Sequence, residues 1–283
     1  MSKRRQFYVL FLMPSLVGML LFFLLPYLAS FHYAFSPPQG SFAGLSNFHD
    51  VLTSISFRTA IANTVRFMAI CVPLNVAFPF ILAWLIHHRK KNSSWLIILF
   101  MFPLVIPTGA SVYFWKIVFG EYGVVNRVIF LLGGEGVHWF QSEAALWVVI
   151  IAFLCKNIGF NMVLLLTGLR YIPQEYYEVA FVEGAGQWKT MRKVTLVYLS
   201  PSLAMTFLMS IINSFKIFRE IYLLFGNYPY KSIYMLQHYM NNQFFAANLQ
   251  KLSVASTVIS LVITVVVLVL IWGQKQLMKN IEE

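Results

Sequence analysis

The chain alternates between long runs of apolar residues and short polar segments. A membrane-spanning helix needs about 20 consecutive, mostly apolar residues, and six stretches of the sequence meet this requirement. Prolines inside these stretches do not exclude helices, because neighbouring helices in a bundle can satisfy the freed backbone groups. The pattern predicts an all-α polytopic membrane protein with a single domain, residues 1–283. Its six predicted spans are residues 7–35, 63–86, 95–115, 144–169, 197–215 and 252–273.

Composition and charge agree with a membrane protein. The residues are 59% hydrophobic and 11% charged, whereas a soluble domain carries about 25% charged residues. A net charge of +11 would suit nucleic acid in a soluble protein, but loop cations of a membrane protein usually report its orientation. Basic residues flank the first, second and sixth spans on one side, at 3–5, 89–91, Lys275 and Lys279. We therefore expect both termini in the cytoplasm, the segment 171–196 on the same side, and no nucleic-acid partner.

The segment 171–196 is too polar to span a membrane, yet it is patterned. Its stretch EGAGQWKT, residues 183–190, is not a phosphate-binding loop, because Glu183 and Trp188 stand where that loop requires glycine. Pro173 favours the start of a helix, and Gly184 and Gly186 permit a tight bend. We expect two short helices joined by a glycine bend. A basic amphipathic helix pair lying on anionic lipid is an alternative interpretation.

The same segment resembles the EAA motif of permease subunits in binding-protein-dependent ABC importers. Glu178, Ala180, Gly184 and Leu196 match the motif at its spacing, whereas valines replace its first Ala, its Ile and its Pro, at positions 179, 194 and 197. Further similarities lie outside the segment, in GLSNF at 44–48, Asn63-Thr64, GVVN at 123–126 and Trp139. Together these features resemble the first permease subunit of carbohydrate importers of the maltose and glycerol-phosphate type.

The resemblance implies an ABC importer type I permease fold whose helix pair couples to a cytoplasmic ATPase. It also implies several partners: a second homologous permease, two ATPase subunits, an extracytoplasmic solute-binding protein and membrane lipid. ATP and magnesium would bind the ATPase subunits, so this chain would be a non-catalytic subunit of the bacterial inner membrane without a cofactor of its own. The expected ATPase-coupling residues are Glu178, Ala180, Phe181, Glu183, Gly184, Ala185, Gly186, Trp188, Lys189 and Met191.

Polar residues inside the apolar runs are candidates for a substrate path, because charged groups at membrane depth usually face a bundle interior or a water-filled cavity. Asn157 and Asn161 share a helix face, and Lys216 and Glu220 are spaced as an i, i+4 pair. Interhelical hydrogen bonding and an interfacial salt bridge are the alternatives. If the cations face a cavity, they suit an acidic sugar or a sugar phosphate. The candidates are Lys156, Asn157, Asn161, Asn213, Lys216, Arg219 and Glu220.

Other functions find little support in the sequence. The six histidines show no metal-ligand spacing, and Cys71 and Cys155 lie in apolar runs that predict packed thiols. An intramembrane enzyme should show a catalytic constellation, and a self-sufficient secondary transporter would usually show an internal repeat with broken helices. We find neither pattern. The expected function is that of a permease subunit of an ATP-driven importer. Such a subunit catalyses no reaction itself and forms half of a translocation path.

Overall fold

The regular structure of the chain is helical throughout the part that is described. The computed structural model describes residues 3–36, 44–89 and 94–282, and no strand occurs in these ranges. Lys90 and Lys91, used above to predict orientation, lie outside them. Within the described residues, five helical segments are long and apolar enough to cross a membrane, or up to six if a bent helix pair counts as one span. The five are Phe11–Phe35, Ile55–His87, Ala145–Arg170, Ser200–Phe225 and Leu249–Gln276.

The chain forms two compact units, and the first comprises Met1–Arg58 and Tyr239–Thr264. Its elements are α1 (Lys3–Met19), a π-helical turn (Leu20–Leu24), α2 (Leu25–Phe35), α3 (Ser46–Thr53) and parts of α4 (Ile55–His87), α14 (Leu236–Phe245) and α15 (Leu249–Glu282). Ser30 of α2 donates a hydrogen bond to Ser253 of α15 over 3.2 Å. Phe57 of α4 packs edge-on against Tyr239 of α14. The prediction of one domain over the whole chain stays a prediction.

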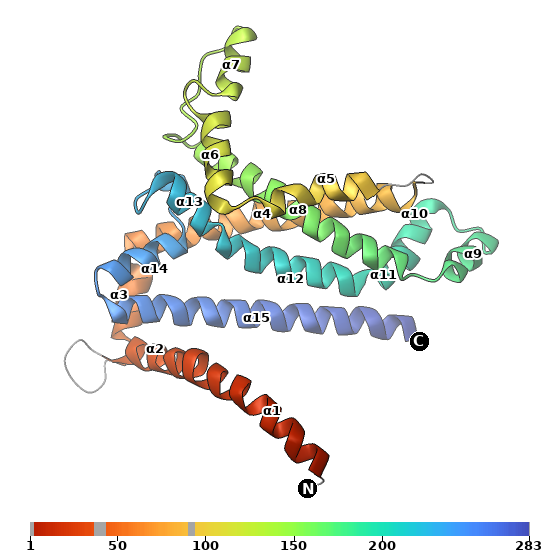
Figure 1. The fold of residues 1–283 in the computed structure, drawn as a ribbon, viewed down its shortest axis with the longest axis horizontal. Helices are drawn as coiled ribbons and strands as arrows, with labels where there is room; N and C mark the ends of the chain where they lie inside the picture. Colours follow the sequence, from red (N-terminus) through yellow and green to blue (C-terminus); the bar gives the residue numbers. More distant parts are fainter. Residues whose placement is uncertain (1–2, 37–43, 90–93, 283) are drawn as a thin grey trace. The chain divides into compact units, whose positions relative to one another are not determined.

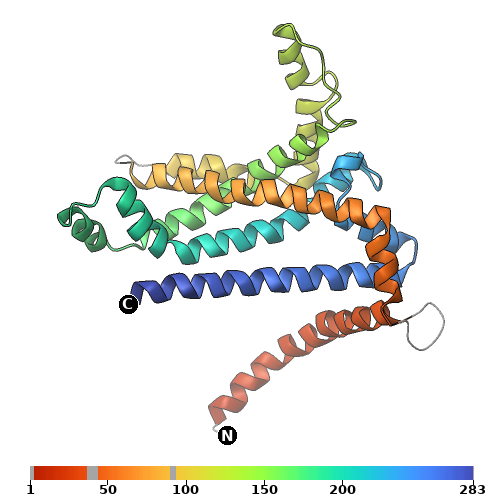
Figure 2. The ribbon, with the colours of Figure 1, turned by 180° about the vertical axis from the view of Figure 1, so that it is seen from behind.

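The second unit, Thr59–His238 and Val265–Glu283, contains the main helix bundle. Most of α4 lies in it beside α5 (Ser94–Val105), α8 (Ala145–Arg170) and α12 (Ser200–Lys216), as both views show (Figures 1 and 2). α8 packs against both α5 and α12. Its residues Met162, Leu165 and Leu169 are fully buried in a cluster that Ala83 of α4 and Leu199 complete.

Two glycines let α8 approach its neighbours closely. A Cβ atom at Gly159 would lie 2.0 Å from the carbonyl oxygen of Phe100 in α5. A Cβ atom at Gly168 would lie 2.3 Å from Oγ of Ser202 in α12. Since non-bonded carbon and oxygen atoms cannot approach so closely, only glycine fits these positions. Small residues at helix interfaces are typical of bundles in membranes, where packing replaces the hydrophobic effect as the force between helices.

The third predicted span, residues 95–115, is not one continuous helix, and its status as a span stays a prediction. α5 ends at Val105, α6 (Thr108–Phe119) begins after Pro107, and the helices on the two sides of this break are bent by 99°. Proline disfavours helical backbone at the residue before it, here Ile106, and lacks the N–H that a continuous helix would use. Figure 1 shows α6 and α7 (Val124–Leu131) leaving the bundle.

The second predicted span, residues 63–86, begins too late. α4 starts at Ile55, because Ser54 caps it: the backbone N–H of Phe57 donates to Oγ of Ser54 over 3.1 Å. Serine is a preferred residue at a helix N-terminus for this reason. Arg58 therefore lies within the helix rather than in a loop before it, and Asn63 lies about two turns inside the helix rather than at its start.

We predict that Gly159→Ala destabilises the bundle by about 1–3 kcal/mol, the usual cost of overpacking a close interface. The added methyl group must push α5 away from α8, because it meets backbone atoms that cannot rotate aside. Thermal unfolding of the purified chain measures the effect. Gly109→Ala is the matched control, since a Cβ atom there meets nothing within 4 Å and alanine favours a helix. Equal melting temperatures for the two variants would contradict the prediction.

Candidate functional site

A cavity of about 420 Å³ lies in the second unit where α8, α12 and α13 (Phe218–Phe225) meet. In Figure 1, α13 lies at the end of the bundle away from α9 (Gln174–Val182). Six of the seven predicted path residues line it, and Asn161 is the exception. The lining consists of Leu104, Thr108, Phe153, Lys156, Asn157, Asn213, Lys216, Ile217, Phe218, Arg219, Glu220 and Gln237.

An ion pair between Lys156 of α8 and Glu220 of α13 crosses this cavity. The side chains are 27% and 7% exposed, so the pair is largely withdrawn from solvent. The ammonium group of Lys156 also donates to Oγ1 of Thr108 in α6 over 3.4 Å. A single lysine therefore connects three helices. A buried carboxylate is stable in its charged form only with such a partner.

The predicted i, i+4 pair between Lys216 and Glu220 is wrong, because Glu220 pairs with Lys156 instead. The regular helix is interrupted at Ile217, where α12 ends and α13 begins. The interruption is slight, because the backbone at Ile217 keeps helical angles of φ −61° and ψ −20°. The helical spacing therefore permits the predicted pair, but Glu220 has its partner in α8 instead. Lys216 and Arg219 are exposed on the cavity, and neither forms a salt bridge within the described part of the chain.

Amide side chains link α8 to its neighbours α4 and α12, both at the cavity and farther along the bundle. Nδ2 of Asn213 in α12 donates to Oδ1 of Asn157 in α8 over 2.9 Å. Asn161 lies outside the lining and instead donates to the carbonyl oxygen of Asn75 in α4 and to Oγ of Ser210 in α12. Interhelical hydrogen bonding, the alternative to a path role, therefore describes Asn161. Asn157 shares its helix face but lines the cavity.

Sequence reasoning missed several residues of this region. Thr108 and Gln237 are polar residues of the lining that lie outside the predicted polar clusters. Asn75 and Ser210 hold Asn161, and both are fully buried. A polar residue inside an apolar run was the available signal for Asn75 and Ser210. Phe153 and Phe218 carry no such signal, because aromatic residues are common throughout the spans.

A buried histidine supports the wall of the cavity without adding charge to it. The ring of His238 contacts that of Phe218 edge-on, with centroids 4.8 Å apart. The backbone N–H of Met235 donates to Nδ1 of His238 over 3.2 Å. Burial lowers the pKa of His238 to about 4. The imidazole is therefore neutral near pH 7, and the charge at the cavity comes from its lysines, arginine and glutamate.

The segment 171–196 contains the expected helix pair. α9 (Gln174–Val182) follows Pro173, and α10 (Gln187–Thr190) follows the bend, where Gly184 has φ +71°. A π-helical turn (Met191–Thr195) and α11 (Leu196–Tyr198) lead on to α12. The hydroxyl groups of Tyr177 and Thr195 are hydrogen-bonded over 3.2 Å. The helix pair is thus attached to the start of the span that reaches the cavity.

Most of the predicted coupling residues lie on the surface of this helix pair. Phe181 is 83% exposed and Trp188 is 71% exposed. Ala180 is buried, so its small side chain allows packing within the chain rather than close approach of a partner. Ala185 and Met191 are half-buried, and the remaining predicted residues are exposed: Glu178, Glu183, Gly184, Gly186 and Lys189. Exposed aromatic and aliphatic side chains in one place mark an interaction site.

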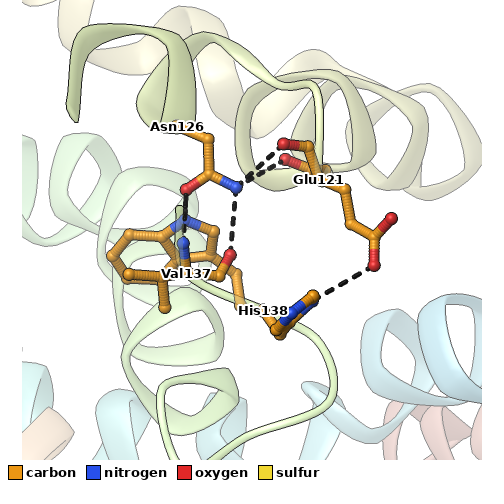
Figure 3. Close-up of polar contacts among 6 residues, drawn as sticks. Glu121, Asn126, Val137 and His138 are labelled. Carbon is orange, nitrogen blue, oxygen red and sulfur yellow. Dashed lines mark hydrogen bonds and ion pairs between the residues drawn. The ribbon is translucent and has the colours of Figure 1, made fainter. Parts of the chain in front are cut away.

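The segment between α6 and α8 is organised around Asn126, which is buried (Figure 3). Nδ2 of Asn126 donates to the carbonyl oxygens of Glu121 and Val137, each over 3.0 Å. Oδ1 accepts from the backbone N–H of Val137 and from the indole N–H of Trp139. This network explains why the GVVN sequence and Trp139 occur together. The amide side chain of Asn126 forms hydrogen bonds with backbone groups of the loop and with the indole N–H of Trp139.

Comparison with known proteins identifies the family. Residues 61–282 match the family described as "Binding-protein-dependent transport system inner membrane component". The chain belongs to this family. It is therefore a membrane permease of a binding-protein-dependent transport system, as its EAA-like segment indicated. Within residues 3–36, 44–89 and 94–282, no group of three His, Cys, Asp or Glu side chains is placed to hold a metal ion.

The permease is similar to characterised sugar permeases. It is 30% identical over 227 residues to the trehalose/maltose transport system permease protein MalF of Thermococcus litoralis, covering 78% of this chain and 77% of that protein. It is 30% identical over 279 residues to the arabinooligosaccharides transport system permease protein AraP of Bacillus subtilis, covering 94% and 87%.

A solved structure shows the same fold. The permease matches a crystal structure of a bacterial ABC transporter involved in the import of the acidic polysaccharide alginate, with a TM-score of 0.83 and 21% identity. The match covers 97% of this chain and 96% of that chain. At this level of identity the likeness concerns the fold alone, and it confirms the predicted ABC importer permease fold.

We predict that Lys156→Met destabilises the permease by about 3 kcal/mol, because it leaves the Glu220 carboxylate buried without its partner. Replacing both residues by methionine should restore most of the stability, since no charge is then left unpaired. Thermal unfolding of the single and double variants measures both effects. Lys216→Met is the matched control: it removes a cation from the same cavity that has no salt bridge in the described residues. A double variant as unstable as Lys156→Met would contradict the prediction.

Proposed function

We propose that the permease forms half of the path through which an ATP-driven importer takes up carbohydrates. The observation that carries the proposal is the gathering of six predicted path residues on one cavity, from helices far apart in the sequence. Amide groups and aromatic rings in this lining suit the hydroxyl groups and apolar faces of a sugar ring. Binding sites for small molecules typically combine such apolar walls with a few polar groups. Relatives named for trehalose, maltose and arabinooligosaccharides support a saccharide substrate.

The helix pair of α9 and α10 is the proposed contact with the ATPase. Exposed Phe181 and Trp188 supply apolar anchors, and Glu183 and Lys189 supply charges at the rim, the arrangement of a typical protein interface. A hollow of about 770 Å³ adjoins the pair and is lined in part by Trp84 and His88 at the end of α4. A protruding side chain of a partner could enter this hollow. Motion of the partner would then reach both α4 and, through Thr195, the start of the fifth span.

The remaining partners follow from the family. A second homologous permease would complete the path, and two cytoplasmic ATPase subunits would bind ATP and magnesium, so that this chain carries no cofactor and no catalytic site. A periplasmic solute-binding protein accompanies the transporter in one related crystal structure, where it holds an alginate pentasaccharide. We place this permease in the bacterial inner membrane with both termini in the cytoplasm. The basic residues flanking its first, second and sixth spans support this orientation.

We predict ATP-dependent uptake of a saccharide by proteoliposomes that contain this permease with its partner subunits and binding protein. Labelled maltose, trehalose and an arabinooligosaccharide are suitable neutral substrates, and an acidic oligosaccharide should be included. Histidine serves as a control for a substrate of another class. Vesicles without ATP should take up none of these compounds. Uptake of histidine, or of no saccharide in an assembly that hydrolyses ATP, would contradict the proposed function.

We predict that Gly184→Val reduces both transport and co-purification of the ATPase. A β-branched residue is strongly disfavoured at φ +71°, so the bend between α9 and α10 must change. Gly186→Val is the matched control, because Gly186 has φ −65° and ψ 161°, which valine adopts readily. A Cβ atom meets nothing within 4 Å at either position. Normal transport by a membrane-inserted Gly184→Val variant would count against the coupling role.

A further inference from the structure

The charges on the cavity do not balance. Lys156, Lys216 and Arg219 line it together with one carboxylate, that of Glu220. Glu220 is engaged by Lys156. Lys216 and Arg219 have no acidic partner in the described part of the chain, so the cavity carries two positive charges in excess. A cleft lined by one sign of charge concentrates ligands of the opposite sign.

The two unbalanced cations lie three residues apart, on either side of Ile217, and both line the cavity. Lys216 is the last residue of α12, and Arg219 lies in the first turn of α13. Both are exposed, so their charged groups are accessible to a ligand. The guanidinium group of arginine forms paired hydrogen bonds with planar acidic groups, and lysine adds a point charge.

Lys156 can contribute to the same ligand. Its ammonium group has three N–H donors, and the contacts with Glu220 and Thr108 use two of them. The side chain is 27% exposed and lines the cavity. Buried His238 adds no charge near pH 7, because its pKa is lowered to about 4. Among the described residues that line the cavity, Glu220 is the only acidic one, so the excess positive charge is not offset.

We propose that the cavity selects saccharides that carry an acidic group, and that Lys216 and Arg219 are the residues that bind this group. The inference rests on the proposed function of the cavity as part of the carbohydrate path. The acid is a carboxylate or a phosphate ester, since the cations suit both. Asn157, Asn213 and Gln237 supply hydrogen-bonding groups for the sugar itself. Neutral sugars use the amide groups but leave both cations unsatisfied.

Binding to the importer complex in lipid nanodiscs, purified through this permease and without the solute-binding protein, tests the inference. The ligands are trigalacturonate, its trimethyl ester, maltotriose and glucose 6-phosphate, with affinities measured by titration calorimetry. The ester keeps the hydroxyl pattern of the acid, removes its charge and adds one methyl group at each carboxylate. We expect trigalacturonate or glucose 6-phosphate to bind at least about tenfold more tightly than the neutral ligands, the size expected for hydrogen bonds to charged groups. The preference should weaken as salt increases, and the two acidic ligands separate carboxylate from phosphate recognition.

The variant Lys216→Gln/Arg219→Gln should lose this preference while still binding the neutral ligands. Lys116→Gln/Arg127→Gln is the matched control: it removes one lysine and one arginine that do not line the cavity, and its preference should remain. Thermal unfolding verifies that both variants fold, and Arg219→Lys should retain most of the preference.

Equal binding of the acid and its ester, or tighter binding of maltotriose, overturns the inference and leaves carbohydrate transport intact. A preference that survives in Lys216→Gln/Arg219→Gln overturns the assignment of these residues. Failure of every saccharide to bind overturns the inference and the proposed function together.

Discussion

Close approach of helix backbones around α8 is the constraint on which the bundle depends. Gly159 and Gly168 stand on this helix two to three turns apart, and each faces a different neighbour. Because a membrane interior gives helices no hydrophobic reason to associate, dispersion contacts and interhelical hydrogen bonds must hold them. Asn161 adds such bonds between the two glycines, to α4 and α12. These contacts also position Lys156 and Asn157 at the cavity, since both lie on the same helix.

The charged residues of the cavity include one ion pair, Lys156–Glu220, and two further cations. Lys156 and Glu220 compensate each other's charge and connect α8 to α13, so they hold the site together even in the absence of a ligand. Lys216 and Arg219 line the same cavity and form no salt bridge within the described residues. The Lys156–Glu220 pair therefore connects two helices of the lining, and the other two cations are the proposed recognition groups. A permease that moves its substrate onward benefits from recognition by exposed groups, because their modest interaction strength in a hydrated site permits release.

Much of the architecture could be predicted from the sequence, because long apolar runs and the glycine bend act locally. Polar residues in apolar runs also identified the cavity, although not the pairing within it. Lys156 and Glu220 are far apart in the chain, and which helix meets which depends on packing that no local pattern encodes. The break in the helix of the third predicted span could not be predicted for a related reason. Hydropathy records only that residues 95–115 are apolar, whereas the direction of the chain changes at Pro107. The start of α4 is a different case. Ser54 is a typical capping residue and could have predicted the helix start, but the polar residues that follow it lower the hydropathy on which the span prediction relied.

The π-helical turn at Met191–Thr195 separates the exposed helix pair from the span that begins with α11. Such a turn holds one residue more than the same stretch of α-helix, and each α-helical residue corresponds to a rotation of about 100°. Conversion of this turn to α-helix would therefore rotate the fifth span about its own axis relative to α9 and α10. The far end of that span carries Asn213 and Lys216. A change of hydrogen-bonding pattern at a single turn would thus alter which side chains the distant cavity presents, with little translation of the helix.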